Sequence, residues 1–187
     1  MINTFFEERV ERLTSAAKRL AAALDGAGIP YRVVGGFAVY AHVEAVDPLA
    51  ARLTRDLDVA VSRGDLSRIA EAVEPLGLTL RHAAGVDLLV EATQPGTRSA
   101  VHLVFVREKV RPEYVEPVPG FSEPVQTADG VLIAPVADLV RMKLTSFRLK
   151  DQVHVQDLDR AGLVTPEIEA GLPDILRTRL AQVRASE

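Results

Sequence analysis

The sequence contains no cysteine and no tryptophan among its 187 residues, and aromatic residues make up only 5% of it. Without cysteine the chain has no disulfide, no thiolate zinc site and no cysteine nucleophile, so its side-chain metal ligands are limited to histidine and carboxylates. We therefore expect any bound metal to be a hard ion held by oxygen atoms.

The sequence also lacks a long apolar run and a large net charge. Its first residues, MINTFFEERVERL, carry three Glu before residue 12, which is typical of neither a signal peptide nor a membrane span. The formal net charge is -4 and 48% of the residues are hydrophobic, which excludes a disordered chain and argues against binding nucleic acid by bulk charge. We expect a soluble, cytoplasmic globular protein that does not bind membranes.

The spacing of apolar and turn residues predicts the order of the elements. Apolar residues recur at steps of three and four from Phe6 to Leu24, which predicts an amphipathic helix that ends near Gly26. Further helices are expected at residues 37–43, 65–76, 136–147, 151–161 and 166–183, the last interrupted at Gly171 and Pro173. Strands are expected at residues 31–34, 56–61, 78–82, 86–92, 100–106 and 131–134, with a hairpin loop around Gln94 to Thr97.

The stretch from residue 107 to residue 124 holds four prolines and charges of both signs. This composition predicts a long ordered loop over the surface. A soft boundary is expected near residue 135, between an α/β core at residues 1–135 and a C-terminal helical part at residues 136–187.

The most informative segment combines a glycine pair with a carboxylate pair. Gly35 and Gly36 lie between a predicted strand and a predicted helix, where missing side chains let backbone N–H groups and the positive helix end meet an anion. Asp56 and Asp58 are two residues apart in an extended run, so their side chains project from the same face. A divalent ion held against a phosphate would compensate their charges. Together the two pairs predict a site for a metal and a triphosphate.

On these residues the sequence resembles the nucleotidyltransferase superfamily with the DNA polymerase β-like fold, in particular its AbiEii-type branch of toxin-antitoxin and phage-defence proteins. The shared features are the Gly-Gly turn and the carboxylate pair of the next strand, preceded by threonine as in Thr54-Arg55-Asp56-Leu57-Asp58. The resemblance covers roughly residues 31–160. It implies an α+β fold, in which a mixed sheet is flanked by helices and followed by a C-terminal helical part.

The resemblance also implies roles for these residues. The nucleotide phosphates would be held by Gly35 and Gly36 with the helix after them, and Thr54 joins this nucleotide-binding set. The catalytic carboxylates Asp56 and Asp58 would hold Mg²⁺.

The family supplies a third carboxylate from a later strand, and here the matching position is occupied by His102. A neutral imidazole suits Mn²⁺ better than Mg²⁺. The alternative third ligand is Asp87, which a shift of the strand alignment would bring beside Asp56.

A second constellation follows in the predicted helix near residue 143. On a continuous helix Lys143, Phe147 and Lys150 share a face, which predicts a cationic edge for a triphosphate. The resemblance implies that Lys143 contacts the triphosphate. It also implies that Asp151, and with it Asp157, orders the site or acts as the base for the acceptor.

Two further residues have open interpretations. Arg52 near the carboxylate pair either binds phosphate or neutralises the acids. His154 lies one turn past Asp151 and is a candidate for the second acidic position of that helix.

The sequence thus predicts a metal-dependent nucleotidyltransferase that uses Mg²⁺, with Mn²⁺ as the alternative ion, to transfer NMP from an NTP. The acceptor hydroxyl belongs to a small molecule, a protein side chain or an RNA 3′ end. The resemblance adds a toxin role with an antitoxin protein as partner. The alternative is a catalytically degenerate protein that keeps the fold as a nucleotide-binding or regulatory module, which His102 in place of the third acid favours.

Overall fold

The chain folds around a mixed β-sheet. The computed structural model describes residues 2–52, 54, 56–93 and 100–186, and of residues 2–7 only the backbone. The helices are α1 (Ile2–Gly26), α2 (Gly35–Glu44), α3 (Leu66–Val73), α4 (Val136–Ser146), α5 (Leu149–Arg160), α6 (Pro166–Ala170) and α7 (Asp174–Ala185), with 3-10 turns η1 (Arg63–Asp65) and η2 (Glu74–Leu76) on either side of α3. The strands are β1 (Tyr31–Val34), β2 (Leu57–Val61), β3 (Leu78–Ala83), β4 (Val86–Glu91), β5 (Val101–Phe105), β6 (Val125–Gln126) and β7 (Leu132–Ile133).

Within the described residues the strands form one seven-stranded sheet in the order β3-β4-β5-β2-β1-β7-β6. The pairs β1–β7 and β2–β5 are parallel, and the other neighbours are antiparallel. Val34 at the end of β1 pairs with Asp58 of β2, which pairs in turn with His102 of β5. Because directly paired residues point to the same face, the Asp58 and His102 side chains share one face of the sheet.

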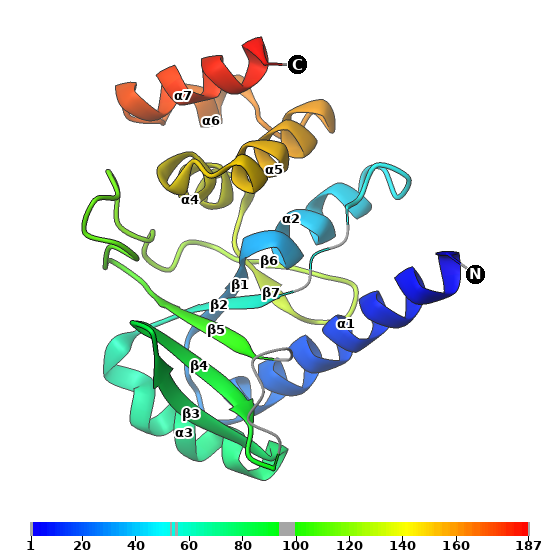
Figure 1. Cartoon of the computed structure of the whole chain (residues 1–187), viewed down its shortest axis with the longest axis vertical. Coiled ribbons are helices and arrows are strands. Elements are labelled where there is room, and N and C mark those ends of the chain that lie inside the picture. The colour runs from blue at the N-terminus through cyan, green and yellow to red at the C-terminus, as the bar shows by residue number, and fades with distance from the viewer. Residues whose placement is uncertain (1, 53, 55, 94–99, 187) are drawn as a thin grey trace.

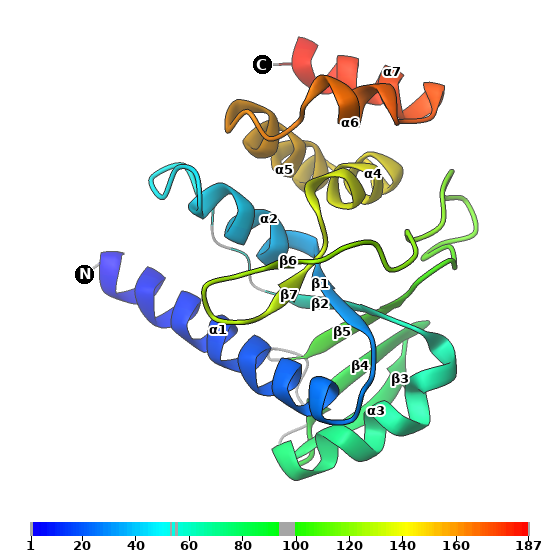
Figure 2. The same ribbon diagram turned by 180° about the vertical axis from the view of Figure 1, so that it is seen from behind.

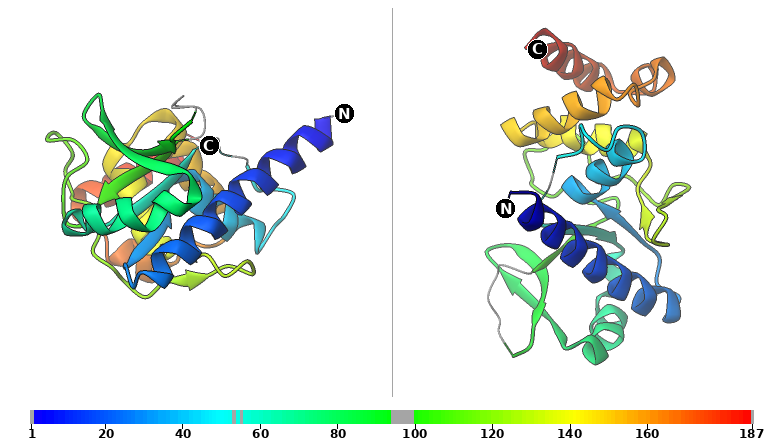
Figure 3. Two further views of the ribbon diagram at one scale, coloured as in Figure 1. Left: turned by 90° about the horizontal axis from the view of Figure 1, so that it is seen from below. Right: turned by 90° about the vertical axis from the view of Figure 1, so that its right-hand side faces the viewer.

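The helices lie in layers on the two faces of this sheet (Figure 1). On one face α1 and α3 pack against each other and against the sheet, and on the other α2 contacts β1 and β2. Beyond α2 lie α4 and α5, which contact α7 in the outermost layer (Figure 2). Figure 3 shows the N-terminal half of α1 projecting past the sheet. None of the described helices is long and apolar enough to cross a membrane.

The core follows the predicted apolar patterns. On α1 the buried positions include Ala17, Leu20 and Leu24, as its amphipathic spacing requires. Val59 and Val61 of β2 are fully buried on one face of the strand, and Asp58, which precedes Val59, points to the opposite face. The Asp58 side chain therefore projects from the face of the sheet on which α2 and the C-terminal helices lie.

The predicted strands and helices are present, and their ends differ from the structure by a few residues. The strand expected at residues 56–61 begins at Leu57, so Asp56 lies just outside it. The reason is that β1 ends at Val34, opposite Asp58, and β5 begins at Val101, opposite Leu57. In the described ladders Asp56 consequently has no partner.

Other differences arise where local signals are weak. The helix expected at residues 65–76 is divided into η1, α3 and η2, and the Asp65 side chain binds Arg68 instead of capping the helix. Strand β6 is only two residues long and was not predicted. The expected hairpin joins β4 and β5, but its loop around Gln94 lies outside the described residues. β7 ends at Ile133 and α4 begins at Val136, while the division into two parts at residue 135 stays a prediction.

Candidate active site

The first close contact among the candidate site residues joins Gly35 and Asp58. Gly35 follows the last residue of β1 and starts α2 with a φ of +69°, a backbone conformation that side chains other than glycine rarely adopt. A Cβ at Gly35 would lie 1.9 Å from Oδ2 of Asp58. The Asp58 carboxylate therefore lies directly against the backbone at the start of α2, and only glycine permits this approach.

The second glycine lies beneath two side chains. A Cβ at Gly36 would lie 2.6 Å from Oγ1 of Thr54 and 3.3 Å from Cε1 of His154. Thr54 comes from the loop between α2 and β2, and His154 comes from α5. The structure thus brings Gly35, Gly36, Thr54 and Asp58 together, as the sequence predicts, and adds His154.

On its other side Asp58 faces His102. His102 Nδ1 lies 3.2 Å from Asp58 Oδ1, within reach of a hydrogen bond. This hydrogen bond raises the pKa of His102, against the effect of its partial burial, and the charges of Asp58 and Asp56 add to the rise. The predicted third ligand is therefore the cross-strand neighbour of Asp58, and its Nδ1 is directed at the carboxylate.

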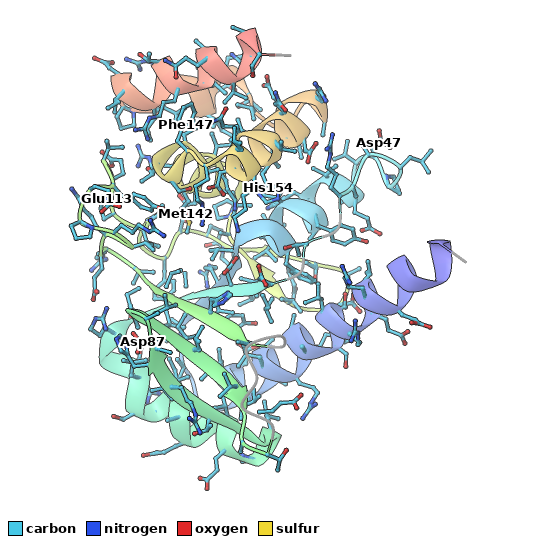
Figure 4. All side chains as sticks on the ribbon, viewed as in Figure 1. Asp47, Asp87, Glu113, Met142, Phe147 and His154 are labelled. Atoms are coloured by element: carbon cyan, nitrogen blue, oxygen red, sulfur yellow. The ribbon has the colours of Figure 1, made fainter. Side chains whose placement is uncertain are left out.

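Asp87, the alternative third ligand, lies elsewhere. It pairs with Leu103 of β5, and its side chain therefore leaves the sheet on the face opposite to His102. It lies 2.9 Å from Nδ1 of His82 and 3.7 Å from a guanidinium nitrogen of Arg63. Figure 4 shows Asp87 far from His154. The hypothesis that Asp87 lies beside Asp56 is wrong, because the pleat of β4 turns it away.

Lys143 is a buried cation on the C-terminal side of the site. Its ammonium group lies 3.1 Å from Oδ1 of Asp151, and its side chain is only 9% exposed. Burial lowers the pKa of Lys143, while the negative charges of Asp151 and Asp58 act in the opposite direction. The Lys143 ammonium group is thus close enough to the Asp58 carboxylate for the two charges to interact.

Asp151 holds the turn between α4 and α5. It is fully buried and accepts hydrogen bonds from Lys143, from Ser146 at 2.8 Å and from Arg148 at 2.6 Å. Burial opposes its ionisation, but the hydrogen bond of Arg148 and the charge of Lys143 outweigh burial and lower the pKa of Asp151 to about 2. Asp151 is therefore ionised at neutral pH, and its carboxylate holds Lys143 and Arg148 in place.

The cationic edge expected on one continuous helix does not exist. α4 ends at Ser146, and Phe147 has a φ of +51°, so the chain turns before α5 begins at Leu149. Lys143 is buried while Lys150 is exposed. The cationic edge requires one helix from Lys143 to Lys150, whereas the sequence pattern itself divides this region into helices at residues 136–147 and 151–161. Arg148, which could be taken for a residue of a solvated helix face, binds Asp151 instead.

His154 completes the cluster as a neutral imidazole. Burial, together with the charge of Lys143, lowers the pKa of His154 to about 4. Its Nδ1 atom is buried and has no hydrogen-bond partner among the described residues. Ser146, Arg148 and the packing of His154 on Gly36 are features that sequence reasoning missed, and the only local signal was their spacing around Asp151.

The two remaining predicted residues lie at the edge of the cluster. Asp56 is exposed and close enough to His102 for its charge to affect that residue. Asp157 is buried on α5 and binds Arg52 at 3.0 Å. Of the two interpretations of Arg52, neutralisation of an acid fits this contact, but the acid is Asp157.

Comparisons with known proteins identify the fold of the chain. No protein-family model matches the sequence, and no curated protein is found to be similar to it. Among solved structures, an antigenic nucleotidyltransferase-like protein from Paracoccidioides brasiliensis superposes with a TM-score of 0.61 at 17% identity, over 95% of this chain and 89% of that one. ANT(2″)-Ia in complex with adenylyl-2″-tobramycin gives a TM-score of 0.56 at 13% identity, over 92% and 97% of the two chains. The solution structure of the antibiotic-resistance factor ANT(2″)-Ia gives 0.50 at 17% identity, over 95% and 85%. The chain therefore has the nucleotidyltransferase fold, which confirms the mixed α+β architecture expected from its sequence.

Proposed function

We propose that the chain is a metal-dependent nucleotidyltransferase that transfers NMP from an NTP to an acceptor hydroxyl. One observation carries the proposal: the Asp58 carboxylate lies against Gly35 at the start of α2 and within electrostatic reach of Lys143. An anion-binding helix start, a hard oxygen ligand and a buried cation meet at one place. These are the groups that a metal-bound triphosphate requires.

The donor set fits Mg²⁺. Mg²⁺ is commonly bound by one or two carboxylates, and it completes its shell with water and substrate phosphate oxygens. Asp58 and Asp56 supply such carboxylates, while no group of three His, Asp or Glu able to hold a metal is assembled in the described part of the chain. His102 stays a candidate third ligand through Nε2, since its Nδ1 faces Asp58. An imidazole ligand would make Mn²⁺ an effective substitute.

The residues of the chain act mainly by positioning and by balancing charge. The backbone of Gly35 and Gly36 receives the phosphates, with Thr54 beside them, and Lys143 balances the charge of the leaving pyrophosphate. When bound, Mg²⁺ neutralises charge on the phosphates. The acceptor oxygen forms a bond to the α-phosphorus and its hydroxyl proton passes to solvent water, while the bond from that phosphorus to the bridging oxygen breaks and pyrophosphate leaves.

In this scheme Asp151 is a positioning residue. It is fully buried and its pKa is lowered to about 2, so it has neither the access nor the basicity to take a proton from an acceptor. Its oxygens instead hold Lys143 and Arg148. Of the two roles implied by the resemblance, the ordering role is the one we propose.

The acceptor is the open part of the proposal. A small molecule, a protein side chain and an RNA 3′ end each offer a hydroxyl. The structure of ANT(2″)-Ia contains an adenylylated small molecule. By analogy ATP and small polyhydroxyl compounds are the first pair to test.

A toxin role in the AbiEii manner, with an antitoxin protein as partner, is the finer hypothesis that follows from the sequence resemblance. It predicts that expression of the chain alone arrests bacterial growth and that the Asp58→Asn variant does not. Normal growth on expression of an active, folded protein would remove the toxin role but leave the nucleotidyltransferase activity untouched.

A non-catalytic nucleotide-binding module is the second candidate. The observation in its favour is His102, which stands beside Asp58 where the family has an acid and carries no negative charge.

One experiment separates the two candidates. The purified protein is incubated with each α-labelled NTP, with Mg²⁺ or Mn²⁺, and with bulk RNA, protein or a panel of small polyhydroxyl acceptors. We expect a labelled product with the wild-type chain and none with Asp58→Asn, while the exposed-site variant Asp129→Asn stays active. Tight nucleotide binding without any labelled product would support the non-catalytic module instead.

A further inference from the structure

The loop between α2 and β2 carries two residues of the proposed site outside any helix or strand. α2 ends at Glu44 and β2 begins at Leu57, so Thr54 and Asp56 both belong to this loop. Neither is fixed by a helix or by a described ladder pair. Their places therefore depend on the contacts that the loop makes with the rest of the molecule.

One such contact is an ion pair to α5. Arg52 Nε lies 3.0 Å from Oδ1 of Asp157. The Asp157 side chain is 7% exposed and that of Arg52 is 58% exposed, so the arginine reaches from the surface onto a nearly buried carboxylate. Burial raises the pKa of Asp157, and the charges of Arg52 and Arg160 oppose that rise. A buried carboxylate of this kind requires a cation close by.

The same loop meets the site two residues further on. Oγ1 of Thr54 lies 2.6 Å from the position that a Cβ on Gly36 would occupy, and His154 of α5 approaches the same position within 3.3 Å. Thr54 Oγ1 also lies 3.5 Å from the backbone nitrogen of Asp56. The α2–β2 loop, α2 and α5 thus meet at Gly36. Arg52, which contacts Asp157 of α5, precedes Thr54 by two residues in the same loop.

We infer that Arg52 and Asp157 are positioning residues, whose ion pair holds the α2–β2 loop on α5 and thereby sets Thr54 and Asp56 at the nucleotide site. The inference rests on the proposed function. It assigns Arg52 to the loop and α5 instead of to a phosphate of the substrate. The α5 carboxylate Asp157 acts through the loop and takes no part in proton transfer.

The expected effect follows from populations. A loop that is released from α5 places Thr54 and Asp56 correctly in only a fraction of molecules, and the apparent affinity for nucleotide falls by that fraction. The chemical step within a correctly assembled complex is unchanged. The pair should therefore act on KM and Kd for the NTP and much less on kcat.

The test is a double-mutant cycle with Arg52→Gln, Asp157→Asn and the double variant. For each protein, calorimetry measures the Kd for NTP with Mg²⁺, hydrogen exchange of the nucleotide-free protein measures protection of the loop, and a thermal melt measures Tm. Arg111→Gln is the matched control, since Arg111 is 61% exposed and lies 3.9 Å from Glu113. Arg52→Lys is the conservative variant.

We expect each single variant to raise Kd by about threefold to tenfold and to speed exchange of the loop, with the double variant no worse than either. The Lys variant should recover part of the affinity, and Arg111→Gln should match the wild type. An unchanged Kd with a lowered Tm, or additive effects in the double variant, would overturn the inference. If the wild type binds no NTP, the proposed function fails, and loop exchange that is unchanged in Arg52→Gln independently refutes the tether.

Discussion

At the scale of single residues, Gly35 is the position of the site where an added Cβ would have the least room, because the Asp58 carboxylate lies against it. Gly35 combines a φ of +69° with a neighbour that leaves no room for a Cβ, whereas Gly28 has a φ of +61° and no atom within 4 Å of a built Cβ. The two glycines share a backbone conformation and differ in their surroundings. A comparison of substitutions at Gly28 and Gly35 therefore separates the effect of the backbone conformation, which both share, from the effect of the nearby Asp58 carboxylate, which only Gly35 has.

Gly35→Ala and Gly28→Ala should destabilise the fold through the backbone by a similar amount, about 1 to 2 kcal/mol. Only Gly35→Ala must also displace the Asp58 carboxylate, so only this variant should lose nucleotide binding. Urea titration and calorimetry with an NTP and Mg²⁺ check the two effects separately. Equal nucleotide affinity in both variants would show that Asp58 does not need its place at Gly35.

His154 predicts a pH dependence of stability. Its pKa is lowered from 6.5 to about 4 in the folded chain by burial and by the charge of Lys143. Between pH 6.5 and 4 His154 is protonated in the unfolded chain and neutral in the folded chain. The contribution of His154 to the free energy of unfolding is therefore fully present above pH 6.5 and is lost as the pH falls toward 4. The slope from one such proton is at most about 1.4 kcal/mol per pH unit.

The variant His154→Gln should therefore show a shallower fall in the free energy of unfolding between pH 6.5 and 4 than the wild type. Urea titrations at four or five pH values in this window measure it. His82→Gln, at an exposed histidine of β3, controls for the loss of one histidine. Parallel curves for wild type and His154→Gln would contradict the assignment of a neutral buried imidazole.

Sequence patterns were informative about residues whose chemistry depends on local spacing. Asp58 lies against Gly35 and Thr54 lies against Gly36, as a glycine pair after one strand and a carboxylate pair on the next strand predict. The partners of Asp151 were not predicted, because Ser146 and Arg148 reach it across the turn between α4 and α5. Which strand face holds Asp87 was also undecided, because register depends on pairing between distant strands.

At the scale of elements, the corner between α4 and α5 is held from outside by α7. Arg179 donates hydrogen bonds to the carbonyl oxygens of Leu144 at 2.7 Å and Thr145 at 2.9 Å, in the last turn of α4. Its guanidinium group also lies 5.0 Å from the centre of the Phe147 ring. A cation at a helix C-terminus satisfies carbonyls that have no partner in the helix and interacts favourably with the helix dipole.

We expect Arg179→Gln to lower the free energy of unfolding by about 1 to 3 kcal/mol, because it removes two charged hydrogen bonds and a cation–π contact. Since Lys143 and Asp151 flank this corner, the affinity for nucleotide should fall as well. Urea titration and calorimetry measure both. Gln182→Ala, at an exposed position of the same helix, should change stability by less than about 0.5 kcal/mol. Equal stabilities of the two variants would contradict a capping role for Arg179.

Periodicity predicted most elements, including a helix end near Phe147, but it did not predict the left-handed turn at that residue. The apolar spacing continues from Leu139 through Phe147, which is why one helix was expected up to that residue. The helix ends one residue earlier, at Ser146, and Phe147 adopts a left-handed conformation beside Arg179 of α7. This is tertiary packing that overrides local preference, and the contact spans more than 30 residues of sequence.

At the scale of the whole molecule, the proposed site lies where the sheet, α2 and the C-terminal helices meet. Asp58 and His102 come from the sheet, Gly35 and Gly36 from α2, and Lys143 from α4. The layered arrangement in Figure 1 brings these elements to one side of the sheet. Nucleotide binding should therefore depend on both the strands and the helices that follow residue 135.

The central claim is that Asp58, held between Gly35 and His102, binds a metal-bound nucleotide. Calorimetric titration of NTP in the presence of Mg²⁺ tests it most directly, on the wild type, on Asp58→Asn and on the control Asp129→Asn, whose residue forms an exposed pair with Lys18. The account predicts binding by the wild type and the control, and an affinity at least about tenfold lower for Asp58→Asn, since a charge-bearing metal ligand is lost. Equal affinity of the wild type and Asp58→Asn, or no binding of any NTP to the wild type with Mg²⁺ or Mn²⁺, would contradict it.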